Sequence, residues 1–391
     1  MPISVDLSVP CANAGGIEVR EREGEVEVVF SPHPHGGPEC LWFCFRVMRR
    51  GEAGGSPTPG AGLCLRLRNL GNMLGGRSAG LMRPVLRDAG GDWERLGPGR
   101  DDDHPDGRRD GLWRVPLPER HLDVAFCYPY GTPEVEALLR DAAGALRADA
   151  IGLSPAGRAL LRLSNDYGEA GGVRPGVFAV ARQHSGETPG SWVLDGFLRR
   201  IAALGREAPL VWAAPLANVD GVEQGDYGKD NFPYDLNRAW GRPPMRHETL
   251  VIQRDMARWA GRCRPGLCLD FHAPGACETG GIYMYLPDPG RFAQASRLAA
   301  PWVEPIASAL GVEFAAAEFG RVASYASRWE SPTFTRFAGE TLGLPALSLE
   351  TPYALCGSTV MTRDRYREAG RRLADAVAAA LAPARKERDA P

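Results

Sequence analysis

Apolar and charged residues alternate along the first third of the chain. Residues 16–30 alternate on either side of Gly24, and this period of two is typical of half-buried strands. Similar short runs, separated by turns rich in glycine and proline, follow at 41–47, 63–70, 112–117 and 122–128. Short strands with frequent turns predict an antiparallel β-sandwich domain over residues 1–125.

After residue 132 the pattern changes to apolar runs that alternate with helical stretches. The strand-like runs cover 159–164, 177–181, 210–214, 267–271, 282–286 and 344–349. Helices are expected from Thr132, as the cap, to about 146, and at about 190–204, 246–260, 291–310, 333–342 and 363–382. This alternation predicts an α/β domain over residues 126–385, with a mostly parallel mixed sheet flanked by helices. Residues 386–391 are expected to form a flexible tail.

Composition narrows the class of protein. The chain has 391 residues, is 44% hydrophobic and carries a net charge of −2, which argues against a nucleic-acid binder. No apolar run reaches the length of about 18 residues that a membrane span needs. The N-terminus lacks a signal-peptide pattern, so we expect a cytoplasmic protein without a membrane partner. Nine scattered cysteines, an odd number, are expected to be reduced and buried.

Three of the predicted strands end in residues that can carry chemistry. The run at 177–181 leads into His184 and Glu187, the run at 267–271 into His272, and the run at 344–349 into Glu350. Sites in α/β sheets form beyond the carboxyl ends of strands, so these groups are expected to converge. Two histidines and one carboxylate with an open fourth position describe a catalytic zinc site. Each residue taken alone is equally compatible with a structural role, and only the combination favours the metal.

A candidate binding pair follows the run at 210–214. Asn237 offers an amide, and Arg238 offers a planar fork of donors that suits a carboxylate bound at two points. In isolation the pair is also compatible with a turn asparagine and a solvated arginine.

Taken together, several short segments resemble the zinc metallocarboxypeptidases, and more narrowly the cytosolic carboxypeptidase branch. They are H-S-G-E-T-P-G-S-W at 184–192, N-V-D-G-V at 218–222, D-L-N-R-A-W at 235–240, D-F-H at 270–272 and L-S-L-E-T at 347–351. The segments L-W-F-C-F-R-V, G-L-M-R-P-V-L and V-A-F-C-Y-P-Y resemble the N-terminal β-sandwich of that branch and its junction with the peptidase domain. The order and rough spacing match over about residues 16–380.

The resemblance implies a role for each site residue. The two histidines and Glu187 match the ligands of one zinc ion per chain, and Asn237 and Arg238 match the pair that binds the terminal carboxylate of the substrate. Glu350 matches the general base, which would accept a proton from the attacking water and pass it to the leaving amine.

The sequence departs from the family at the position of an arginine that usually polarises the scissile carbonyl. An ungapped comparison puts Gly228 at that position, with Lys229 beside it. Lys229 and Lys386 are the only lysines, and the other 44 of the 46 basic residues are arginines. The coding bias of the gene strongly favours arginine, so this bias does not explain a lysine at position 229. We expect Lys229 to contact the oxyanion or a substrate carboxylate; a surface-loop lysine is the alternative.

Two further assignments are less direct. Tyr325 is the first candidate for the tyrosine that closes over substrate in the family, with Tyr283 and Tyr353 as competitors. Arg336 lies in the window that selects the terminal side chain, which suggests a preference for C-terminal Glu or Asp. Because Thr333 resembles a helix N-cap, Arg336 has a plain helix-surface alternative.

These observations predict a bacterial zinc metallocarboxypeptidase that removes residues from the C-terminus of a peptide, a protein tail or a peptide-like metabolite. The alternative within hydrolases is a zinc deacylase of the succinylglutamate desuccinylase or aspartoacylase type, which acts on a small N-acyl amino acid. The N-R-A-W block and the large N-terminal sandwich favour the peptidase. A binding protein that has lost catalysis would lack a ligand or the base, and the sequence holds all four.

Overall fold

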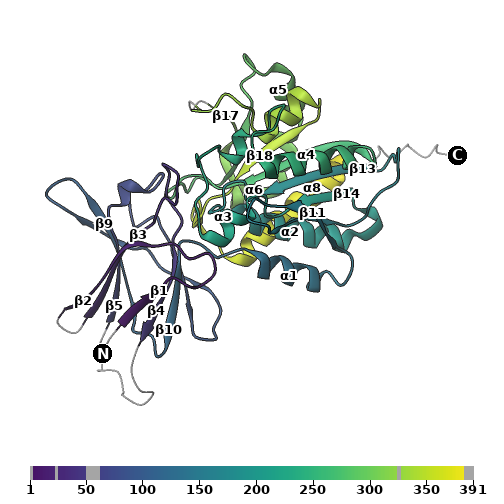
Figure 1. Cartoon of the computed structure of the whole chain (residues 1–391). Coiled ribbons are helices and arrows are strands. Elements are labelled where there is room, and N and C mark those ends of the chain that lie inside the picture. Colours follow the sequence, from purple (N-terminus) through teal and green to yellow (C-terminus); the bar gives the residue numbers. More distant parts are fainter. Residues whose placement is uncertain (1–2, 23–24, 50–61, 324–326, 383–391) are drawn as a thin grey trace.

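The computed structural model describes residues 3–22, 25–49, 62–323 and 327–382 of the chain. Strands β1 to β10 form an N-terminal part, and a larger α/β part follows (Figure 1). The exact limits of separate folding units stay a prediction. No helix in the described ranges combines the length and apolar character that crossing a membrane requires.

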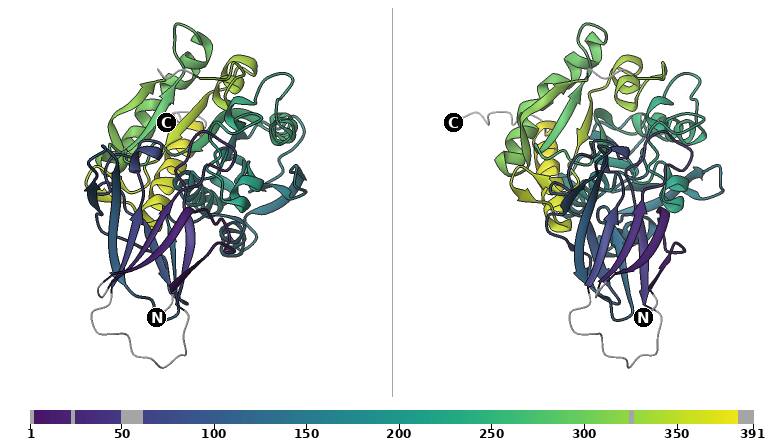
Figure 2. Two further views of the ribbon diagram at one scale, coloured as in Figure 1. Left: turned by 60° about the vertical axis from the view of Figure 1, so that its left-hand side comes forward. Right: turned by 90° about the vertical axis from the view of Figure 1, so that its left-hand side faces the viewer.

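Two five-stranded sheets make up the N-terminal part (Figure 2). One sheet is antiparallel throughout and runs in the order β1 (Ile3–Asp6), β4 (Cys44–Arg49), β10 (His121–Ala125), β6 (Val85–Asp88) and β7 (Glu94–Arg95). The other runs in the order β2 (Gly15–Arg22), β3 (Glu25–Ser31), β5 (Gly62–Leu67), β9 (Arg109–Pro116) and β8 (Arg100–Asp103). In this second sheet β3 and β5 are parallel, one exception to the predicted antiparallel arrangement.

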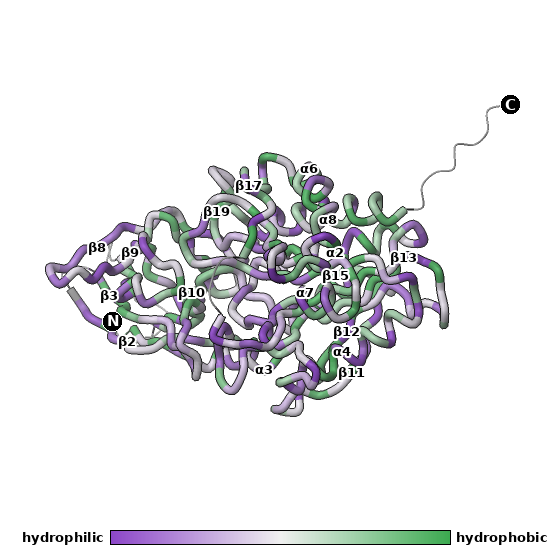
Figure 3. Tube along the Cα trace, turned by 90° about the horizontal axis from the view of Figure 1, so that it is seen from above, coloured by the Kyte–Doolittle hydropathy of each residue, from purple (hydrophilic) through white to green (hydrophobic). Residues whose placement is uncertain are grey.

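The two N-terminal sheets pack face to face through alternate apolar residues. Phe30 of β3 lies 4.7 Å, between ring centroids, from Phe45 of β4. Val28 and Leu65 from the second sheet and Val124 from the first are fully or almost fully buried in the same core. The hydrophilic hairpin β8–β9 lies at the outer end of the molecule (Figure 3). The apolar alternation in the sequence therefore corresponds to one inward face on each sheet.

The α/β part is built on a mixed sheet of eight strands. Its order is β11 (Arg147–Leu153), β12 (Ala159–Ser164), β14 (Leu210–Ala214), β13 (Pro175–Ala181), β15 (Arg264–His272), β18 (Ala346–Glu350), β16 (Ile282–Leu286) and β17 (Ala315–Val322). The four central strands β14, β13, β15 and β18 are parallel, whereas β11, β12 and β16 join by antiparallel pairs. The predicted mostly parallel mixed sheet is confirmed. The edge strands β11 and β17 lie outside the predicted runs, and β19 (Leu355–Cys356) and β20 (Thr359–Val360) form a small separate hairpin.

Helices cover both faces of this sheet (Figure 1). On β13, Val177 and Ala179 belong to the core that includes α2 (Thr188–Leu204) and α8 (Arg363–Leu381). The intervening Phe178 and Val180 pack instead with α4 (His247–Ala260) and α7 (Phe334–Arg336), and the ring of Phe178 lies 5.6 Å from that of Trp259. The strand is therefore apolar throughout because both faces are buried.

Several predicted helices differ in their limits. The helix expected at 132–146 is α1 (Thr132–Asp141), and Gly131, not Thr132, is its N-cap, with Glu134 accepting the Gly131 N–H. The stretch at 291–310 divides into α5 (Ala293–Ala299) and α6 (Val303–Phe314), and 333–342 is the single turn α7 followed by a π-helical turn, η5 (Phe337–Thr341). The predicted cap at Thr333 is present: its side chain accepts the Arg336 N–H. Further short elements are η1 (Leu70–Asn72), η2 (Gly205–Glu207), α3 (Val219–Gln224), η3 (Leu236–Arg238) and η4 (Ala300–Trp302).

All nine cysteines are free and buried, as the sequence predicts. Burial raises the pKa of thiols such as Cys11 and Cys64 to about 11. A thiol with such a pKa is protonated and unreactive at neutral pH, so these cysteines act as small apolar residues of the core.

Candidate active site

The carboxyl ends of three neighbouring strands bring the predicted site residues together. His184 follows β13, His272 ends β15 and Glu350 ends β18. His272 and Glu350 are direct partners in the parallel register of β15 and β18, so their side chains leave the sheet on the same side. Glu187 is the N-cap of α2, the helix that follows β13. The convergence predicted from the strand ends is present in the structure.

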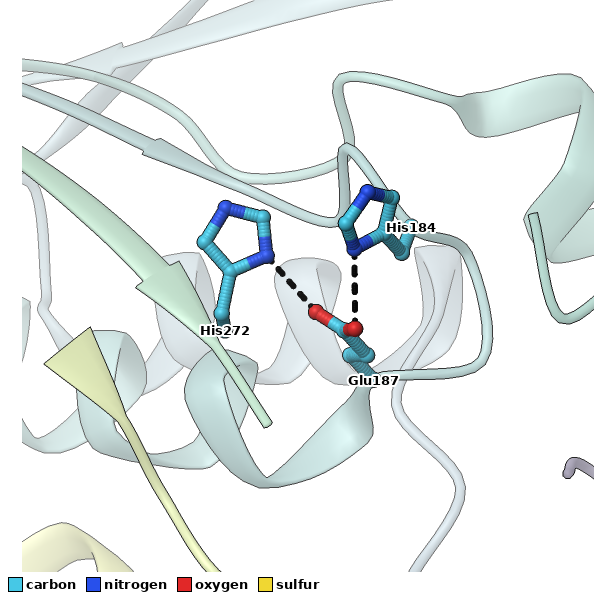
Figure 4. Close-up of side chains that lie close together, drawn as sticks. All are labelled: His184, Glu187 and His272. Atoms are coloured by element: carbon cyan, nitrogen blue, oxygen red, sulfur yellow. Dashed lines mark hydrogen bonds and ion pairs between the residues drawn. The ribbon is translucent and has the colours of Figure 1, made fainter. Parts of the chain in front are cut away.

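His184, Glu187 and His272 form a compact, buried group (Figure 4). The Nδ1 atom of His184 lies 2.8 Å from one carboxylate oxygen of Glu187, and Nδ1 of His272 lies 2.7 Å from the other. One ligand atom from each residue lies within 4.8 Å of the others. All three side chains are at most 5% exposed.

Each histidine also contacts a second carboxylate through its other ring nitrogen. Nε2 of His184 lies 3.2 Å from Asp235 Oδ1, and Nε2 of His272 lies 2.9 Å from Asp270 Oδ2. A carboxylate behind a metal-binding histidine fixes the ring orientation and leaves the opposite nitrogen for the metal. Here the two Nδ1 atoms point inward to Glu187, which is the arrangement that a shared cation requires.

The electrostatics of the group also suit a cation. Burial lowers the pKa of His184, but Glu187 and Asp235 outweigh burial and raise this pKa to about 9. Burial likewise opposes the effect of Asp270 and Glu187, which raise the pKa of His272 well above its usual value. Three carboxylates thus surround two imidazoles in a buried space. Nitrogen and carboxylate donors in this set fit a divalent metal such as zinc.

A cavity of about 850 Å³ opens in front of this group. Its lining includes the trio, Glu350 and four more of the predicted site residues: Lys229, Asn237, Arg238 and Arg336. The N-terminal sandwich contributes Leu74 and Gly75 to the wall. The cavity therefore opens at the carboxyl edge of the eight-stranded sheet, and its walls include the segments that follow β16 and β17 and one loop of the sandwich.

That loop is held tightly against the loop that follows His272 at the end of β15. The N–H of Ala276 donates to the Leu74 carbonyl at 2.8 Å. Gly75 has a positive φ of 68°, and a Cβ at this position would lie 2.9 Å from the Gly275 Cα. Only glycine fits this close backbone approach, so the sandwich loop forms a fixed part of the cavity wall.

Glu350 is a buried carboxyl at the cavity edge with 9% of its surface exposed. Burial raises the pKa of Glu350 to about 7, and the charge of Glu187 adds to this effect, while His272 and Lys229 oppose it. A carboxyl with a pKa near 7 can both accept and release a proton at neutral pH.

The structure explains why position 228 cannot hold an arginine. Gly228 has a φ of +85°, and a Cβ there would lie 2.5 Å from Ser185 Oγ and 2.6 Å from Ser185 N. Any larger side chain would force apart the loop that carries His184. Lys229, the next residue, lines the cavity and is close enough to influence the pKa of Glu350.

Asn237 and Arg238 occupy different surroundings. Asn237 is 5% exposed; its Nδ2 lies 2.9 Å from His272 Nε2, and its Oδ1 accepts the Phe334 N–H at 3.0 Å. Both ends of this amide therefore contact protein groups. Arg238 lines the cavity and donates from Nε to Ser327 Oγ at 3.2 Å. Of the pair, Arg238 is the better placed to reach a ligand.

The candidate tyrosines separate clearly. Tyr325 lies outside the described residues. Tyr283 lines the cavity and is the register partner of Glu350 across β16 and β18. Tyr353 is 1% exposed, is not part of the cavity lining and packs against Phe126, with ring centroids 4.7 Å apart. Its interpretation as a core aromatic next to the Glu350 strand fits this environment.

Sequence reasoning missed the two aspartates behind the histidines. Asp270 lies two residues before His272 on one strand, and side chains two apart point to the same face. Asp235 lies two residues before Asn237 and also accepts the Asn237 N–H at 2.7 Å, which closes the turn η3. The D-F-H and D-L-N-R motifs therefore contained a signal for both.

Comparisons with known proteins agree with this geometry. No protein-family model matches the chain. The chain is 31% identical over 122 residues, 29% of its length, to cytosolic carboxypeptidase 1 of Mus musculus. It is 33% identical over 149 residues, 34% of its length, to cytosolic carboxypeptidase 6 of Homo sapiens. These matches span only 10% and 30% of the two relatives.

Solved structures match over almost the whole chain. A metallo-carboxypeptidase from Burkholderia cenocepacia superposes with a TM-score of 0.74 at 18% identity, covering 97% of this chain and 98% of the other. A metallo-carboxypeptidase from Pseudomonas aeruginosa, solved with (2-guanidinoethylmercapto)succinic acid, superposes with a TM-score of 0.72 at 19% identity, covering 96% and 98%. The fold, sandwich included, is that of the metallo-carboxypeptidases. In sequence, the chain resembles the cytosolic carboxypeptidases over about a third of its length.

Proposed function

We propose that the protein is a zinc-dependent carboxypeptidase that hydrolyses the C-terminal amide bond of a peptide or protein tail. The observation that carries this proposal is the shared cavity: the His-Glu-His group, the Glu350 carboxyl with a pKa near 7, and cationic side chains that include Lys229 and Arg238 face one space. Such a set combines a metal site, a proton carrier and groups that bind a carboxylate.

His184, Glu187 and His272 would hold the metal. When bound, zinc would supply a Lewis acid and lower the pKa of a coordinated water. The burial of the trio and the outer carboxylates Asp235 and Asp270 keep the donor atoms in place. The contacts of Asp235 and Asp270 with the two histidines are already formed in the structure, so holding the metal would require no movement of the strands.

Glu350 is the proposed proton carrier. A carboxylate oxygen of Glu350 would accept a proton from the attacking water and release it to the leaving amine nitrogen. Its pKa near 7 allows both halves of this transfer at neutral pH.

Two cations are proposed to bind the substrate at different points. The Arg238 guanidinium, with Asn237 beside it, would bind the terminal carboxylate. The Lys229 ammonium would stabilise the negative charge that develops on the scissile carbonyl oxygen. A single ammonium cannot form the two parallel bonds of an arginine, so the substrate is held there by a point charge. The steric exclusion of a side chain at Gly228 supports this assignment.

Arg336 supports a preference for C-terminal Glu or Asp. It lines the cavity and is 14 residues before Glu350, in the window expected for the side-chain pocket. The fold match to metallo-carboxypeptidases over 97% of the chain supports a peptidase over the alternative deacylase.

The test is a terminal-residue assay by mass spectrometry. The zinc-loaded protein is incubated with a mixed peptide library, and we expect the loss of single residues from C-termini only. Glu350→Gln should keep its bound zinc and lose this activity, because the metal ligands are intact and the proton carrier is not. Glu136→Gln on α1, where the side chain is 63% exposed, is the matched control and should cleave like the wild type.

Stoichiometric zinc with no peptide cleavage would refute the proposed activity. Acyl amino acids would then be the next substrates, and their hydrolysis would establish the deacylase instead.

A further inference from the structure

A turn of the N-terminal sandwich, residues 33–37, packs against the loop 225–232 that carries Lys229. A Cβ at Gly37 would lie 2.0 Å from Asn231 Oδ1 and 3.3 Å from the Lys229 carbonyl oxygen. Only glycine fits so close an approach. The turn and the loop are therefore in direct contact at the residue whose side chain lines the cavity.

The start of this loop is bonded to the same part of the sandwich. Nδ1 of His35 lies 2.9 Å from Asp226 Oδ1. The Asn13 amide donates from Nδ2 to the carbonyl oxygens of His33, at 2.9 Å, and Gly225, at 2.7 Å. Asn13 also accepts the His33 N–H at 2.7 Å and is only 2% exposed. This buried amide thus joins the turn to the loop beside the His35–Asp226 contact.

The turn holds His35 in a conformation that is uncommon for residues other than glycine. The φ angle of His35 is +44°, in the left-handed region, and its N–H donates to His33 Nδ1 at 3.1 Å. The rings of the two histidines lie 4.7 Å apart, and the Gly37 N–H closes the turn on the Pro34 carbonyl at 3.2 Å. A strained backbone persists only where the surrounding contacts stabilise it, and such sites are often functional.

On the other side of the contact, Asp226 is tied to the segment that carries His184. Its N–H donates to the Gly221 carbonyl at 2.8 Å, and its carbonyl accepts the hydroxyl of Ser185 at 3.0 Å. Burial raises the pKa of Asp226, and the hydrogen bond with His35 opposes this effect. A buried carboxylate needs such a partner to remain ionised. Asp226 lies three residues before Lys229, so its position limits where the ammonium can reach.

We infer that His35 is a positioning residue: with the turn 33–37, it holds the Asp226 end of the loop so that the Lys229 ammonium faces the cavity beside Glu350. This inference rests on the proposed function, in which Lys229 stabilises the charge that develops on the scissile carbonyl oxygen. Within the described ranges, no residue of the turn belongs to the cavity lining. The effect of His35 on the reaction therefore acts through Lys229.

The first experiment is a double-mutant cycle with zinc-loaded His35→Ala, Lys229→Ala and the double variant on a cleaved peptide. We expect His35→Ala to lower kcat by about tenfold with little change in KM, because the ammonium is displaced while Arg238 still binds the terminal carboxylate. In the Lys229→Ala background, His35→Ala should change kcat by less than about twofold. An unchanged kcat in His35→Ala, or losses that multiply in the double variant, overturns the inference.

His104→Ala is the matched control. His104 pairs with Asp110 in the sandwich at 3.0 Å, with side chains 34% and 10% exposed, against 30% and 14% for His35 and Asp226. Neither His104 nor Asp110 belongs to the cavity lining. The control therefore removes an equivalent ion pair without touching the loop of Lys229, and it should cleave peptide like the wild type.

Two further variants separate the contact from a general loss of structure. Asparagine tolerates a positive φ, and its Nδ2 can take the place of the ring Nδ1, so His35→Asn should restore most of kcat. A kcat in His35→Asn as low as in His35→Ala would contradict a role for the Nδ1 contact. Asp226→Ala breaks the contact from the other side and leaves no unpaired buried carboxylate, so it should fold and lower kcat as His35→Ala does.

The second experiment observes Lys229 without hydrolysis. Lys229 and Lys386 are the only lysines, so Lys386→Arg leaves one lysine for reductive methylation with isotope-labelled formaldehyde, which keeps the positive charge. Nuclear magnetic resonance then detects the labelled methyl groups, and the signal missing from Lys229→Arg identifies Lys229. In the zinc-loaded protein, His35→Ala and Asp226→Ala should move this signal, whereas His104→Ala should leave it in place.

The two experiments distinguish this inference from the proposed function. A signal that moves in His35→Ala and not in His104→Ala supports the positioning even if the wild type cleaves no peptide; the absence of cleavage then refutes only the peptidase. A signal that stays unchanged in both His35→Ala and Asp226→Ala overturns the inference, whatever the activity of the wild type.

Discussion

The sandwich and the cavity at the sheet edge use arginine in opposite ways. In the sandwich, Arg66 contacts three acids: Glu27 at 2.6 Å, Asp102 at 2.6 Å and Asp110 at 3.0 Å. In the cavity, Arg291 and Arg336 contact no carboxylate of the described residues. The arginine side chains of both regions are partly exposed. Nothing in the local sequence indicates which of them pair with a carboxylate.

A second cluster in the sandwich makes the contrast sharper. Arg46 lies on β4 and Arg87 on β6, the two strands that flank β10. Both side chains bond to the buried carboxylate of Asp123 on β10, at 2.5 Å and 2.8 Å. Charges satisfied within the fold contribute to stability, whereas charges left without a partner in a cavity are available to a ligand. The comparison predicts that substitutions in the sandwich change stability and that substitutions in the cavity change binding and catalysis.

The largest effect should come from the metal site. His272→Ala removes one of three donor groups, so we expect bound zinc to fall from one per chain to near zero and peptide cleavage to fall to background. Zinc content by mass spectrometry and the terminal-residue assay measure both. His121→Ala, on β10 of the sandwich, is the control and should keep metal and activity. Full zinc binding by His272→Ala would show that the trio is not the metal site.

Lys229→Ala tests the cation that lies beside Gly228. Removing a donor to a developing oxyanion typically costs about 10²–10³-fold in kcat, and we expect a loss in this range with zinc retained. Steady-state kinetics on a cleaved peptide separates kcat from KM. A change within twofold would assign Lys229 to the surface of its loop instead.

Asp123→Ala should have the converse effect in the sandwich. We expect the free energy of unfolding to fall by about 1.5–3 kcal/mol, because two charged hydrogen bonds to a buried carboxylate are lost. The activity per folded molecule should not change. Urea denaturation measures the stability. Asp106→Ala, which removes an ion pair with both side chains more than half exposed, should leave it unchanged. If Asp123→Ala and Asp106→Ala lowered the free energy of unfolding equally, the proposed difference between buried and exposed ion pairs would be wrong.

The smallest expected effect is the pH dependence of the stability that Asp123 contributes. Burial raises the pKa of Asp123, but hydrogen bonds from Arg46 and Arg87 outweigh burial and lower it below the usual value. A lowered folded-state pKa contributes stability above the unfolded pKa of about 3.9, and this contribution is lost as pH falls through the folded pKa. The stability difference between wild type and Asp123→Asn should therefore be constant from about pH 5 to pH 8 and shrink on acidification below about pH 4. Urea titrations at several pH values measure it, and a difference that grows on acidification would contradict the sign.

The positions of the candidate site residues could be predicted best where a polar residue follows a buried strand. His184, His272 and Glu350 come directly after apolar runs, and parallel strands deliver their carboxyl ends to one edge. Helix limits were less accurate, because the ends of α1 and of α5 depend on neighbours. Glu340, far along the chain, caps α5, and no pattern within 291–310 indicates that contact.

The sequence by itself predicted the class of fold and the residues that converge at the sheet edge, because periodicity and motif spacing act over short distances along the chain; the metal and proton-transfer roles of these residues belong to the proposed function. Tertiary structure alone decided which charges are satisfied. The pairing of Arg66 with three acids, and the lack of a carboxylate partner for Arg291 within the described ranges, depend on residues brought together from distant segments. The same holds for Gly228, whose contact with Ser185 excludes the usual arginine and leaves Lys229 as the cation beside Glu350. Whether a charged residue serves stability or ligand binding therefore depends on the partners that the fold places beside it, and not on the residue type.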